Sequence, residues 1–430
     1  MYDIFIKNGF VYYNGRFAKK NIGITGEKFS YVGDDEYTAK KVIDASNKKI
    51  IPGLIDPHVH FESPSCDDFY DGSKAASYGG ITTVIDFLKP TRNATELKEA
   101  FLEKSEKAKR CSVDYHFHAC ICEPDGNLEE YVLMMKELGI NTVKVFTTYS
   151  EDHKRTFDKD IKKLLRLSKK YDFLVLAHAE NEEMINNDEK FNYKDLAASR
   201  PSEAETKEAL KLAKYAVQTK GHLYLVHCSS GNTIDQICKK YYSNVGKNIF
   251  FESCPRYFVY NKNVLKSKQG YLFTFVPPLR NEPERKLLIK YIDEVHTIGS
   301  DHRAFLMQDK EANKELNKIP LGVGEVEYSF HIMYKMFGDK VINKMSTNVA
   351  KINYLPNRGQ IKVGNFADLC IFSGQNYTIG KPHDNSDYSI FEHIKVGTTI
   401  ESTMVRGKFV LENGKFVENE GQYIKCGKVK

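Results

Sequence analysis

Hydrophobic and polar positions over the first 50 residues form short apolar segments separated by turn-forming residues. This pattern is typical of strands, because Gly, Asn and Asp interrupt an extended chain and let it reverse. The predicted strands span residues 3–7, 10–13, 21–25, 29–32 and 41–44. The turn signals between them are Asn8-Gly9, Asn14-Gly15 and Gly33-Asp34-Asp35. This β-rich module is too small to form a full domain alone.

From about residue 52 to about residue 350, short apolar strands alternate with helical stretches. The predicted strands span residues 54–61, 82–87, 113–121, 142–146, 173–178, 223–227, 249–251 and 295–299. Helices are predicted between most of them, for example over residues 94–109, 128–138, 159–169, 202–218 and 232–241. This alternation predicts an α/β fold with a parallel (β/α)8 barrel of the TIM type. A Rossmann-like open sheet is the alternative, but no glycine-rich phosphate loop follows the first strand.

Strands return after about residue 350. The apolar segments span residues 359–372, 403–407 and 409–412. Asn413-Gly414 then follows, which is a strong hairpin signal. Two β-rich ends that flank a barrel are expected to pair into one small β-sandwich. The predicted domains are a composite sandwich of residues 1–51 and 352–430 and a barrel of residues 52–351.

Composition narrows the function classes only slightly. Of the 430 residues, 41% are hydrophobic and 28% charged, as in an ordinary globular protein. The net charge of +6 is too dilute to argue for a nucleic-acid partner. Nine cysteines without any C-x-x-C pair suggest a reduced, intracellular chain. No apolar run approaches the roughly 20 residues of a membrane-spanning helix, so no membrane association and a cytoplasmic location are predicted.

Side chains that bind metals or transfer protons lie within, at the end of, or just after the predicted barrel strands. They are His58, His60, Lys144, His178, His227 and Asp301. A single histidine at a strand end is usually structural, a lysine can extend to solvent and an aspartate can cap a helix. Catalytic groups of a barrel, however, gather at the C-terminal ends of its strands, and neutral imidazole is the commonest zinc ligand. The joint occurrence therefore favours a metal site.

Lys144 stands between apolar residues, on a strand whose alternation points it into the barrel. Burying an ammonium group is costly, so the pKa of this lysine should fall. A neutral amine is nucleophilic and can add carbon dioxide. The resulting carbamate is a carboxylate on a long stem, which could bridge two cations. Two such cations would activate a water and polarise a carbonyl group.

These residues resemble the cyclic-amidohydrolase branch of the amidohydrolase superfamily, and most closely its dihydropyrimidinases and hydantoinases. The resemblance covers nearly the whole chain. Its motifs are residues 52–60, 67–69, 79–83, 144–149, 178–181, 227–230, 277–280, 299–302 and 364–369. It implies hydrolysis of a small cyclic ureide, a dihydropyrimidine or a 5-substituted hydantoin, to an N-carbamoyl amino acid. It also implies a homotetramer.

The resemblance assigns a role to each candidate ligand of two divalent metal ions, for which zinc is expected. His58 and His60 would bind the more buried ion, and His178 and His227 the more exposed one. Lys144, carbamylated by carbon dioxide, would bridge both.

The remaining roles concern catalysis and substrate binding. Asp301 would bind the buried metal and carry the proton from the attacking water to the leaving nitrogen. Tyr149, five residues after Lys144, would donate a hydrogen bond to the developing oxyanion. Val276 stands where the family usually has serine, and Leu321 where it usually has asparagine. Both positions would hold the ring amide through main-chain groups.

Three alternatives remain. A dihydroorotase would have an arginine two residues after the second histidine, where this chain has Glu62. An allantoinase would lack the spacing of Lys144, Phe146 and Tyr149. A non-enzymatic dihydropyrimidinase-related scaffold would have lost metal ligands, whereas this chain keeps all of them. We therefore favour the hydantoinase and dihydropyrimidinase reaction over these three.

Other metal-competent residues are expected to be structural. His116 and His118 form a second His-x-His pair, but no carboxylate or third histidine follows at a matching strand end. His302 is expected to support a ligand rather than to be one. Cys228 and Cys254 are expected to be small core residues.

Overall fold

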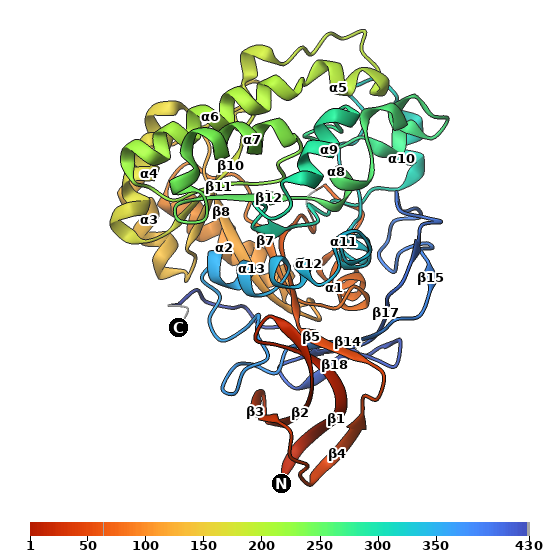
Figure 1. The fold of residues 1–430 in the computed structure, drawn as a ribbon. Coiled ribbons are helices and arrows are strands. Elements are labelled where there is room, and N and C mark those ends of the chain that lie inside the picture. Colours follow the sequence, from red (N-terminus) through yellow and green to blue (C-terminus); the bar gives the residue numbers. More distant parts are fainter. Residues whose placement is uncertain (63, 428–430) are drawn as a thin grey trace. The chain divides into compact units, whose positions relative to one another are not determined.

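The computed structural model describes residues 1–62 and 64–427 (Figure 1). The chain divides into two compact units. The terminal unit consists of Met1–Ile85, Lys107–His116 and Gly324–Lys430, and the central unit of Asp86–Glu106 and Phe117–Val323. Both chain ends, red and blue in Figure 1, thus belong to the terminal unit. The division predicted after residues 51 and 351 stays a prediction.

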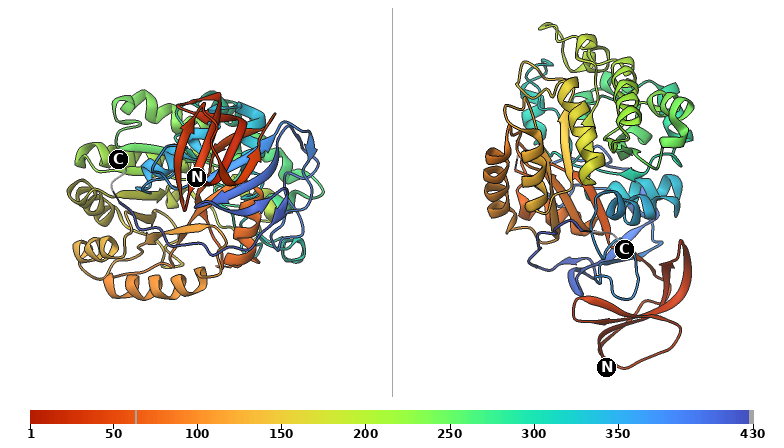
Figure 2. Two further views of the ribbon diagram at one scale, coloured as in Figure 1. Left: turned by 90° about the horizontal axis from the view of Figure 1, so that it is seen from below. Right: turned by 90° about the vertical axis from the view of Figure 1, so that its left-hand side faces the viewer.

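A nine-stranded sheet is the main feature of the terminal unit. Its strands are β1 (Tyr2–Tyr13), β2 (Arg16–Thr25), β3 (Lys28–Gly33), β4 (Ala39–Asp44), β5 (Lys49–Pro52), β14 (Leu369–Ser373), β17 (Thr399–Val405), β18 (Lys408–Glu412) and β19 (Lys415–Phe416). They are paired in the order β19-β18-β17-β14-β5-β1-β2-β3, and β4 pairs with β1. Figure 2 shows the red strands of the N-terminal end beside the blue strands of the C-terminal end.

Strands β5 and β14 join the two ends of the chain. They are antiparallel, and Ile50 lies opposite Ile371. Both side chains belong to one buried apolar cluster with Ile22, Phe29 and Met404. Because this cluster draws on both ends of the chain, neither end could bury it alone. The predicted β structure built from both chain termini is confirmed.

The turn signals of the terminal unit have two different outcomes. Asn14-Gly15 and Asn413-Gly414 each have two positive φ values, 51° and 81° in the first pair and 50° and 75° in the second. Such values are typical of the type I′ turns that close two-residue hairpins. The turn predicted at Asn8-Gly9 is wrong, because β1 continues through it. Asn8 instead forms a bulge with a φ of 66°, and its backbone N–H donates to Oδ1 of Asn21 at 3.1 Å.

An eight-stranded sheet contains the predicted barrel strands in chain order. Its strands are β6 (Leu54–Val59), β7 (Ile81–Phe87), β8 (Asp114–Cys120), β9 (Thr142–Phe146), β10 (Leu174–His178), β11 (Leu223–Leu225), β12 (Ile249–Ser253) and β13 (Thr297–Ile298). Neighbouring strands from β8 to β13 are parallel. Eight strands in this order, alternating with helices, form the predicted TIM-like barrel fold.

The helices follow the strands along the chain. They are α1 (Phe69–Tyr78), α2 (Ala94–Ala108), α3 (Leu128–Glu137), α4 (Asp158–Tyr171), α5 (Leu196–Ser199), α6 (Ser202–Thr219), α7 (Gly231–Tyr241), α8 (Pro255–Val259), α9 (Glu282–Lys290), α10 (Met307–Ala312), α11 (Ser329–Phe337), α12 (Lys340–Lys344) and α13 (Thr347–Ile352). Two short strands, β15 (Tyr377–Thr378) and β16 (Lys395–Val396), pair separately. Within the described residues, no helix is long and apolar enough to cross a membrane.

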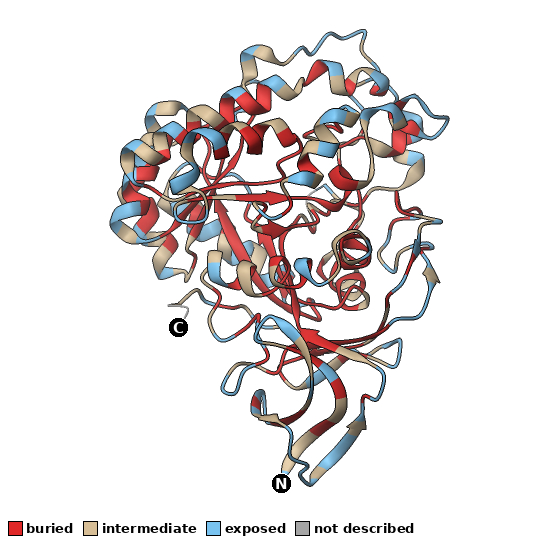
Figure 3. Ribbon diagram, viewed as in Figure 1, coloured by how far each residue is buried: buried red, intermediate tan, exposed pale blue. Residues whose placement is uncertain are grey.

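Burial explains why these sequences form these elements. In α4 the buried residues include Ile161, Leu164, Leu165 and Ser168, which recur at the spacing of one helix face, while charged residues cover the other face. Strand β10 is buried along its whole length, as expected when both faces of a parallel sheet are covered. Figure 3 shows the contrast between buried strands and helices that are exposed on one side.

Candidate metal centre

Three neighbouring parallel strands of the central unit bring predicted residues to one edge of the sheet. Strand β9 pairs with β10, and β10 with β11. Lys144 on β9 lies opposite Leu176 on β10, and His178 is the last residue of β10. His227 follows two residues after β11 ends. Because parallel strands end at the same edge, His178 and His227 come from adjacent strand ends, and Lys144 lies two residues before the end of β9.

Three predicted residues have backbones in the left-handed region. The φ values are 72° at Tyr149, 40° at His227 and 48° at Asp301. Positive φ is uncommon for residues other than glycine and gathers at functional sites. At His227 it also explains why β11 ends at Leu225, two residues before the predicted end. The chain turns out of the strand as it reaches the ligand candidate.

The imidazoles of His178 and His227 face each other. Nδ1 of His178 lies 3.1 Å from Nε2 of His227, and both side chains are buried. The other ring nitrogen of His178, Nε2, lies 2.7 Å from Oε2 of Glu180. Burial raises the pKa of Glu180, but the charge of Arg200 and the hydrogen bond from His178 outweigh this effect and lower the pKa to about 2.

Glu180 sets the tautomer of His178. An ionised carboxylate can only accept, so Nε2 of His178 must carry the proton and donate it. Burial also lowers the pKa of His178, which keeps the ring neutral. The lone pair on Nδ1 is therefore left facing Nε2 of His227. A carboxylate that orients a histidine in this way is typical of zinc sites, so the donor pair fits a divalent metal ion.

Lys144 is buried, and its ammonium group lies against aromatic rings. Nζ is 5.1 Å from the ring centroid of Phe87 and 5.2 Å from that of Phe146. Burial lowers the pKa of Lys144 to about 8, although the charges of Asp301 and Glu252 oppose the shift. A fraction of the amine is therefore neutral near physiological pH, as nucleophilic attack on carbon dioxide requires.

Asp301 follows β13 and pairs with an arginine that the sequence analysis missed. Its Oδ2 lies 2.5 Å from Nη2 of Arg256, whose side chain is fully buried. The same guanidinium donates from Nη1 to the backbone oxygen of Ser300 at 2.7 Å. These two bonds fix the orientation of the carboxylate. The available signal was one charged residue within the otherwise apolar segment of α8, directly after a predicted barrel strand.

Tyr149 is half-buried beside the histidine pair. Its ring centroid lies 5.5 Å from that of His178, and Cζ of Arg200 lies 5.0 Å from the same tyrosine ring. Burial raises the pKa of Tyr149 to about 12, although the charge of Arg200 opposes the shift. The hydroxyl therefore stays protonated at neutral pH and can donate a hydrogen bond.

His58 and His60 belong to the terminal unit. His58 is buried within β6 and His60 follows the strand, half-buried. Their ring centroids are 5.2 Å apart. The backbone N–H of His58 donates to Oδ1 of Asp56 at 3.0 Å, which fixes the chain directly before the first histidine. As the two-residue spacing predicts, the pair stands together at one strand end.

The two predicted substrate segments of the central unit lie side by side. Thr274 donates from Oγ1 to the backbone oxygen of Pro320 at 3.2 Å and accepts at its backbone oxygen from the N–H of Gly322 at 3.0 Å. Thr274 stands two residues before Val276, and Leu321 lies between Pro320 and Gly322. The structure therefore brings these segments together, and their contact with a substrate stays a prediction.

The residues expected to be structural have ordinary partners. Nδ1 of His116 lies 2.7 Å from the backbone oxygen of Ile424, and burial lowers the pKa of this imidazole to about 4. Nδ1 of His118 lies 2.6 Å from Oγ1 of Thr142 on the neighbouring strand. The buried thiol of Cys228 donates to the backbone oxygen of Leu225 at 3.4 Å.

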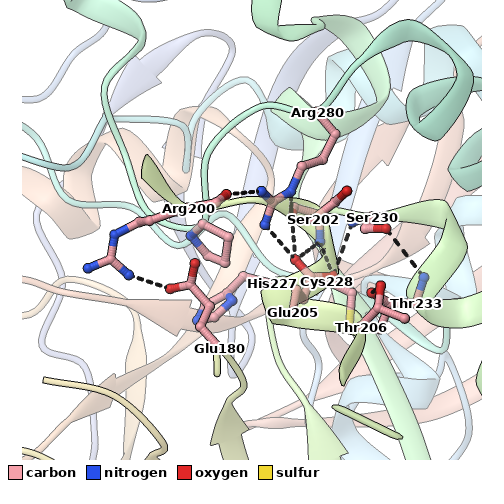
Figure 4. A network of polar contacts seen from close by, with 12 residues as sticks. Glu180, Arg200, Ser202, Glu205, Thr206, His227, Cys228, Ser230, Thr233 and Arg280 are labelled. Atoms are coloured by element: carbon pink, nitrogen blue, oxygen red, sulfur yellow. Dashed lines mark hydrogen bonds and ion pairs between the residues drawn. The ribbon is translucent and has the colours of Figure 1, made fainter. Parts of the chain in front are cut away.

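A buried polar network that the sequence analysis also missed surrounds the loop after His227 (Figure 4). Glu205 on α6 accepts from the backbone N–H of Ser230 at 3.1 Å and pairs with Nη2 of Arg280 at 3.3 Å. Nε of Arg280 also donates to Oγ of Ser229 at 2.8 Å. The network holds the chain that follows the histidine ligand candidate.

Comparison with known proteins shows which family this chain belongs to. The chain matches the amidohydrolase family over residues 50–410. It is 31% identical to the D-hydantoinase of Geobacillus stearothermophilus, over 98% of this chain and 96% of that protein. It is 29% identical to the dihydropyrimidinase of Dictyostelium discoideum, over 98% and 90%. The crystal structure of dihydropyrimidinase from Brevibacillus agri superposes with a TM-score of 0.94 at 29% identity, over 99% of both chains.

The chain therefore belongs to the amidohydrolase family, in its group of hydantoinases and dihydropyrimidinases. The coverage of nearly the full length means that both units take part in the likeness, not the barrel alone. The TIM-like barrel and the family predicted from the sequence are both confirmed.

Proposed function

We propose that the protein is a binuclear-metal hydrolase that opens the cyclic amide bond of a dihydropyrimidine or a 5-substituted hydantoin. The product would be an N-carbamoyl amino acid. The observation that carries the proposal is the buried pair of His178 and His227, with the tautomer of His178 set by Glu180 beside a lysine of lowered pKa. Membership in a family of cyclic amidases supports the substrate class.

Six side chains are the proposed ligands of the two metal ions. They are His58, His60, Lys144 as its carbamate, His178, His227 and Asp301. When bound, two divalent cations, which we propose to be zinc, supply Lewis acidity that polarises the scissile carbonyl and makes water nucleophilic near neutral pH. The nitrogen and oxygen donors of this set suit zinc. The neutral amine of Lys144 would add carbon dioxide and release a proton, which gives the set its bridging carboxylate.

The side chains around the metals would move the proton and stabilise charge. Asp301, oriented by Arg256, would take the proton of the attacking water and pass it to the leaving nitrogen. The hydroxyl of Tyr149, kept protonated by its raised pKa, would donate to the oxyanion as the tetrahedral centre forms. Main-chain groups at Val276 and Leu321 would hold the ring amide.

The decisive experiment is a substrate panel with the purified, zinc-loaded protein. The panel should contain dihydrouracil, hydantoin, 5-substituted hydantoins, allantoin and dihydroorotate. We expect turnover of the first three classes, and poor turnover of dihydroorotate because Glu62 would repel its carboxylate. If none of the ureides is opened, the proposal fails. Metal analysis in parallel excludes a non-enzymatic scaffold if the protein carries two metal ions per chain.

Two further properties belong to the same proposal. We propose a homotetramer by likeness to the hydantoinases, and light scattering of the purified protein tests it. We also propose a cytoplasmic location. The chain has nine cysteines and no C-x-x-C pair, which fits a reducing compartment.

A further inference from the structure

Arg200 lies directly before Pro201 and α6, and its side chain is almost completely buried. We propose that Arg200 is a positioning residue that aligns two groups of the centre at once, the metal ligand His178 and the oxyanion donor Tyr149. The inference rests on the proposed function and adds a residue to it. Since only 6% of Arg200 is exposed, the guanidinium acts through its neighbours rather than on the substrate.

The first link runs through Glu180. Nη1 of Arg200 lies 2.6 Å from Oε2 of Glu180 (Figure 4). The same oxygen lies 2.7 Å from Nε2 of His178. Because Oε2 of Glu180 accepts from both Arg200 and His178, the arginine helps to fix the position of this oxygen. The position of the oxygen in turn directs Nδ1 of His178 toward His227. Rotation of the Glu180 carboxylate would release the ligand nitrogen from this orientation.

The second link is the contact with Tyr149. Cζ of Arg200 lies 5.0 Å from the centroid of the tyrosine ring, within the range of a cation–π contact. The backbone of Tyr149 has a φ of 72°, a conformation that surrounding contacts must hold in place. The guanidinium and the ring of His178, 5.5 Å from the tyrosine ring, are two such contacts. A shift of Arg200 would therefore move the hydroxyl as well.

Arg200 is itself fixed in position by a second buried arginine, Arg280. Its backbone oxygen accepts from Nη1 of Arg280 at 2.5 Å. Arg280 also bonds Ser229 and Glu205, which fix the chain after His227. One buried network therefore connects the segments that follow β10 and β11 (Figure 4). Arg200 adds the contact with Tyr149, which follows β9. Functional groups supported by such a network keep the alignment that catalysis requires.

The test compares Arg200→Gln and Arg200→Lys with wild type and with Arg285→Gln. Arg285 is the control, because its guanidinium makes an ion pair of the same length, 2.6 Å, with Glu282, which is not part of the candidate centre. The first readout is metal content after dialysis against graded chelator. We expect Arg200→Gln to lose one of two metal ions at about 10- to 100-fold lower chelator concentration, and Arg285→Gln to match wild type.

The second readout separates the two links. In Arg200→Gln, kcat should fall by about 10- to 100-fold with little change in KM. The same substitution in a Tyr149→Phe background should cost less than in wild type, because one of its two targets is already removed. Arg200→Lys keeps the positive charge but loses the planar guanidinium. Its kcat should therefore lie between those of wild type and Arg200→Gln. If Arg200→Gln does not fold, the lysine variant carries both readouts.

The outcomes distinguish this inference from the proposed function. Two metal ions retained as firmly as in wild type, together with wild-type kcat, would overturn the positioning role. Equal costs of Arg200→Gln in both backgrounds would overturn the link to Tyr149 alone. Wild-type protein that binds two metal ions and opens no ureide would overturn the proposed function. Metal retention by Arg200→Gln compared with wild type would then still test whether Arg200 positions His178.

Discussion

The proposed carbamylation of Lys144 should depend on pH, because burial lowers the pKa of this side chain. The amine must lose its proton before it adds carbon dioxide, and burial lowers its pKa from 10.5 to about 8. At pH 7 the neutral fraction is then about 10%, against about 0.03% for an unperturbed lysine, a gain of roughly 300-fold. The reactive form is thus abundant near neutral pH only because the side chain is buried.

The assay starts from metal-free enzyme in buffer without carbon dioxide. Zinc is added with or without ¹³C-labelled bicarbonate, between about pH 6 and about pH 10, and both activity and the carbamate signal in ¹³C NMR are followed. We expect recovery to require bicarbonate. The rate at a fixed concentration of dissolved carbon dioxide should rise up to about pH 8 and then level off, since the amine is neutral above its pKa.

Two variants assign the signal. Lys144→Ala should show no carbamate signal and no recovery. Lys310→Gln should keep the signal, although Lys310 is also buried and its pKa is also lowered by burial, because its amine already donates to Thr274. Recovery without bicarbonate, a signal that persists in Lys144→Ala, or a rate that climbs steadily to pH 10 would each refute the reasoning.

Three further predictions concern catalysis and stability. Tyr149→Phe should lower kcat by about 100- to 1,000-fold with little change in KM in steady-state assays, because an oxyanion donor is lost, and wild-type kcat would contradict that role. Asp114→Asn should lower the free energy of unfolding by about 3 to 5 kcal/mol in urea, because the buried guanidinium groups of Arg358 and Arg406 lose a charged partner, and a loss below about 1 kcal/mol would refute this. Burial lowers the pKa of His331 from 6.5 to about 4, so the unfolded chain takes up a proton first and stability should fall, by up to about 3 kcal/mol, as the pH drops through this window. His331→Gln should flatten the dependence of Tm on pH between these values, and an unchanged slope would argue against it.

Most of the barrel could be predicted because its signals are local. Residues 142–146 were expected as a strand and form β9 with the same bounds, since an apolar run between turn residues has few alternatives. The bulge at Asn8 shows where local signals fail. Asn-Gly suits both a hairpin turn and a bulge, and the choice depends on pairing of β1 with β2, where Gly9 lies opposite Lys20. That pairing is a tertiary property.

Residues of the candidate site also fall into two groups, those predictable from the local sequence and those that depend on tertiary contacts. Strand ends and residue chemistry identified His178 and His227, and the structure places their facing nitrogens 3.1 Å apart. Their roles as ligands stay predictions. Arg200 and Arg256 could not be predicted, because each is recognised only by the carboxylate that it meets, 20 and 45 residues away in the chain. The sequence alone does not show which of its 63 basic residues are buried.

The buried arginines also bear on whether the fold would depend on the metal ions proposed for it. The carboxylate of Glu180 pairs with Arg200, and that of Asp301 with Arg256. Without such partners, these two carboxylates would be poorly compensated charges once the proposed cations left, and the fully buried Glu180 would destabilise the fold by about 3 to 5 kcal/mol. Because the arginines remain paired with Glu180 and Asp301, loss of metal should not destabilise the fold through these two carboxylates. The metal-free protein should therefore remain folded, with a far-ultraviolet circular dichroism spectrum and urea midpoint close to those of the loaded protein. Collapse of the fold on chelation would show that the metals, rather than the arginines, balance this charge.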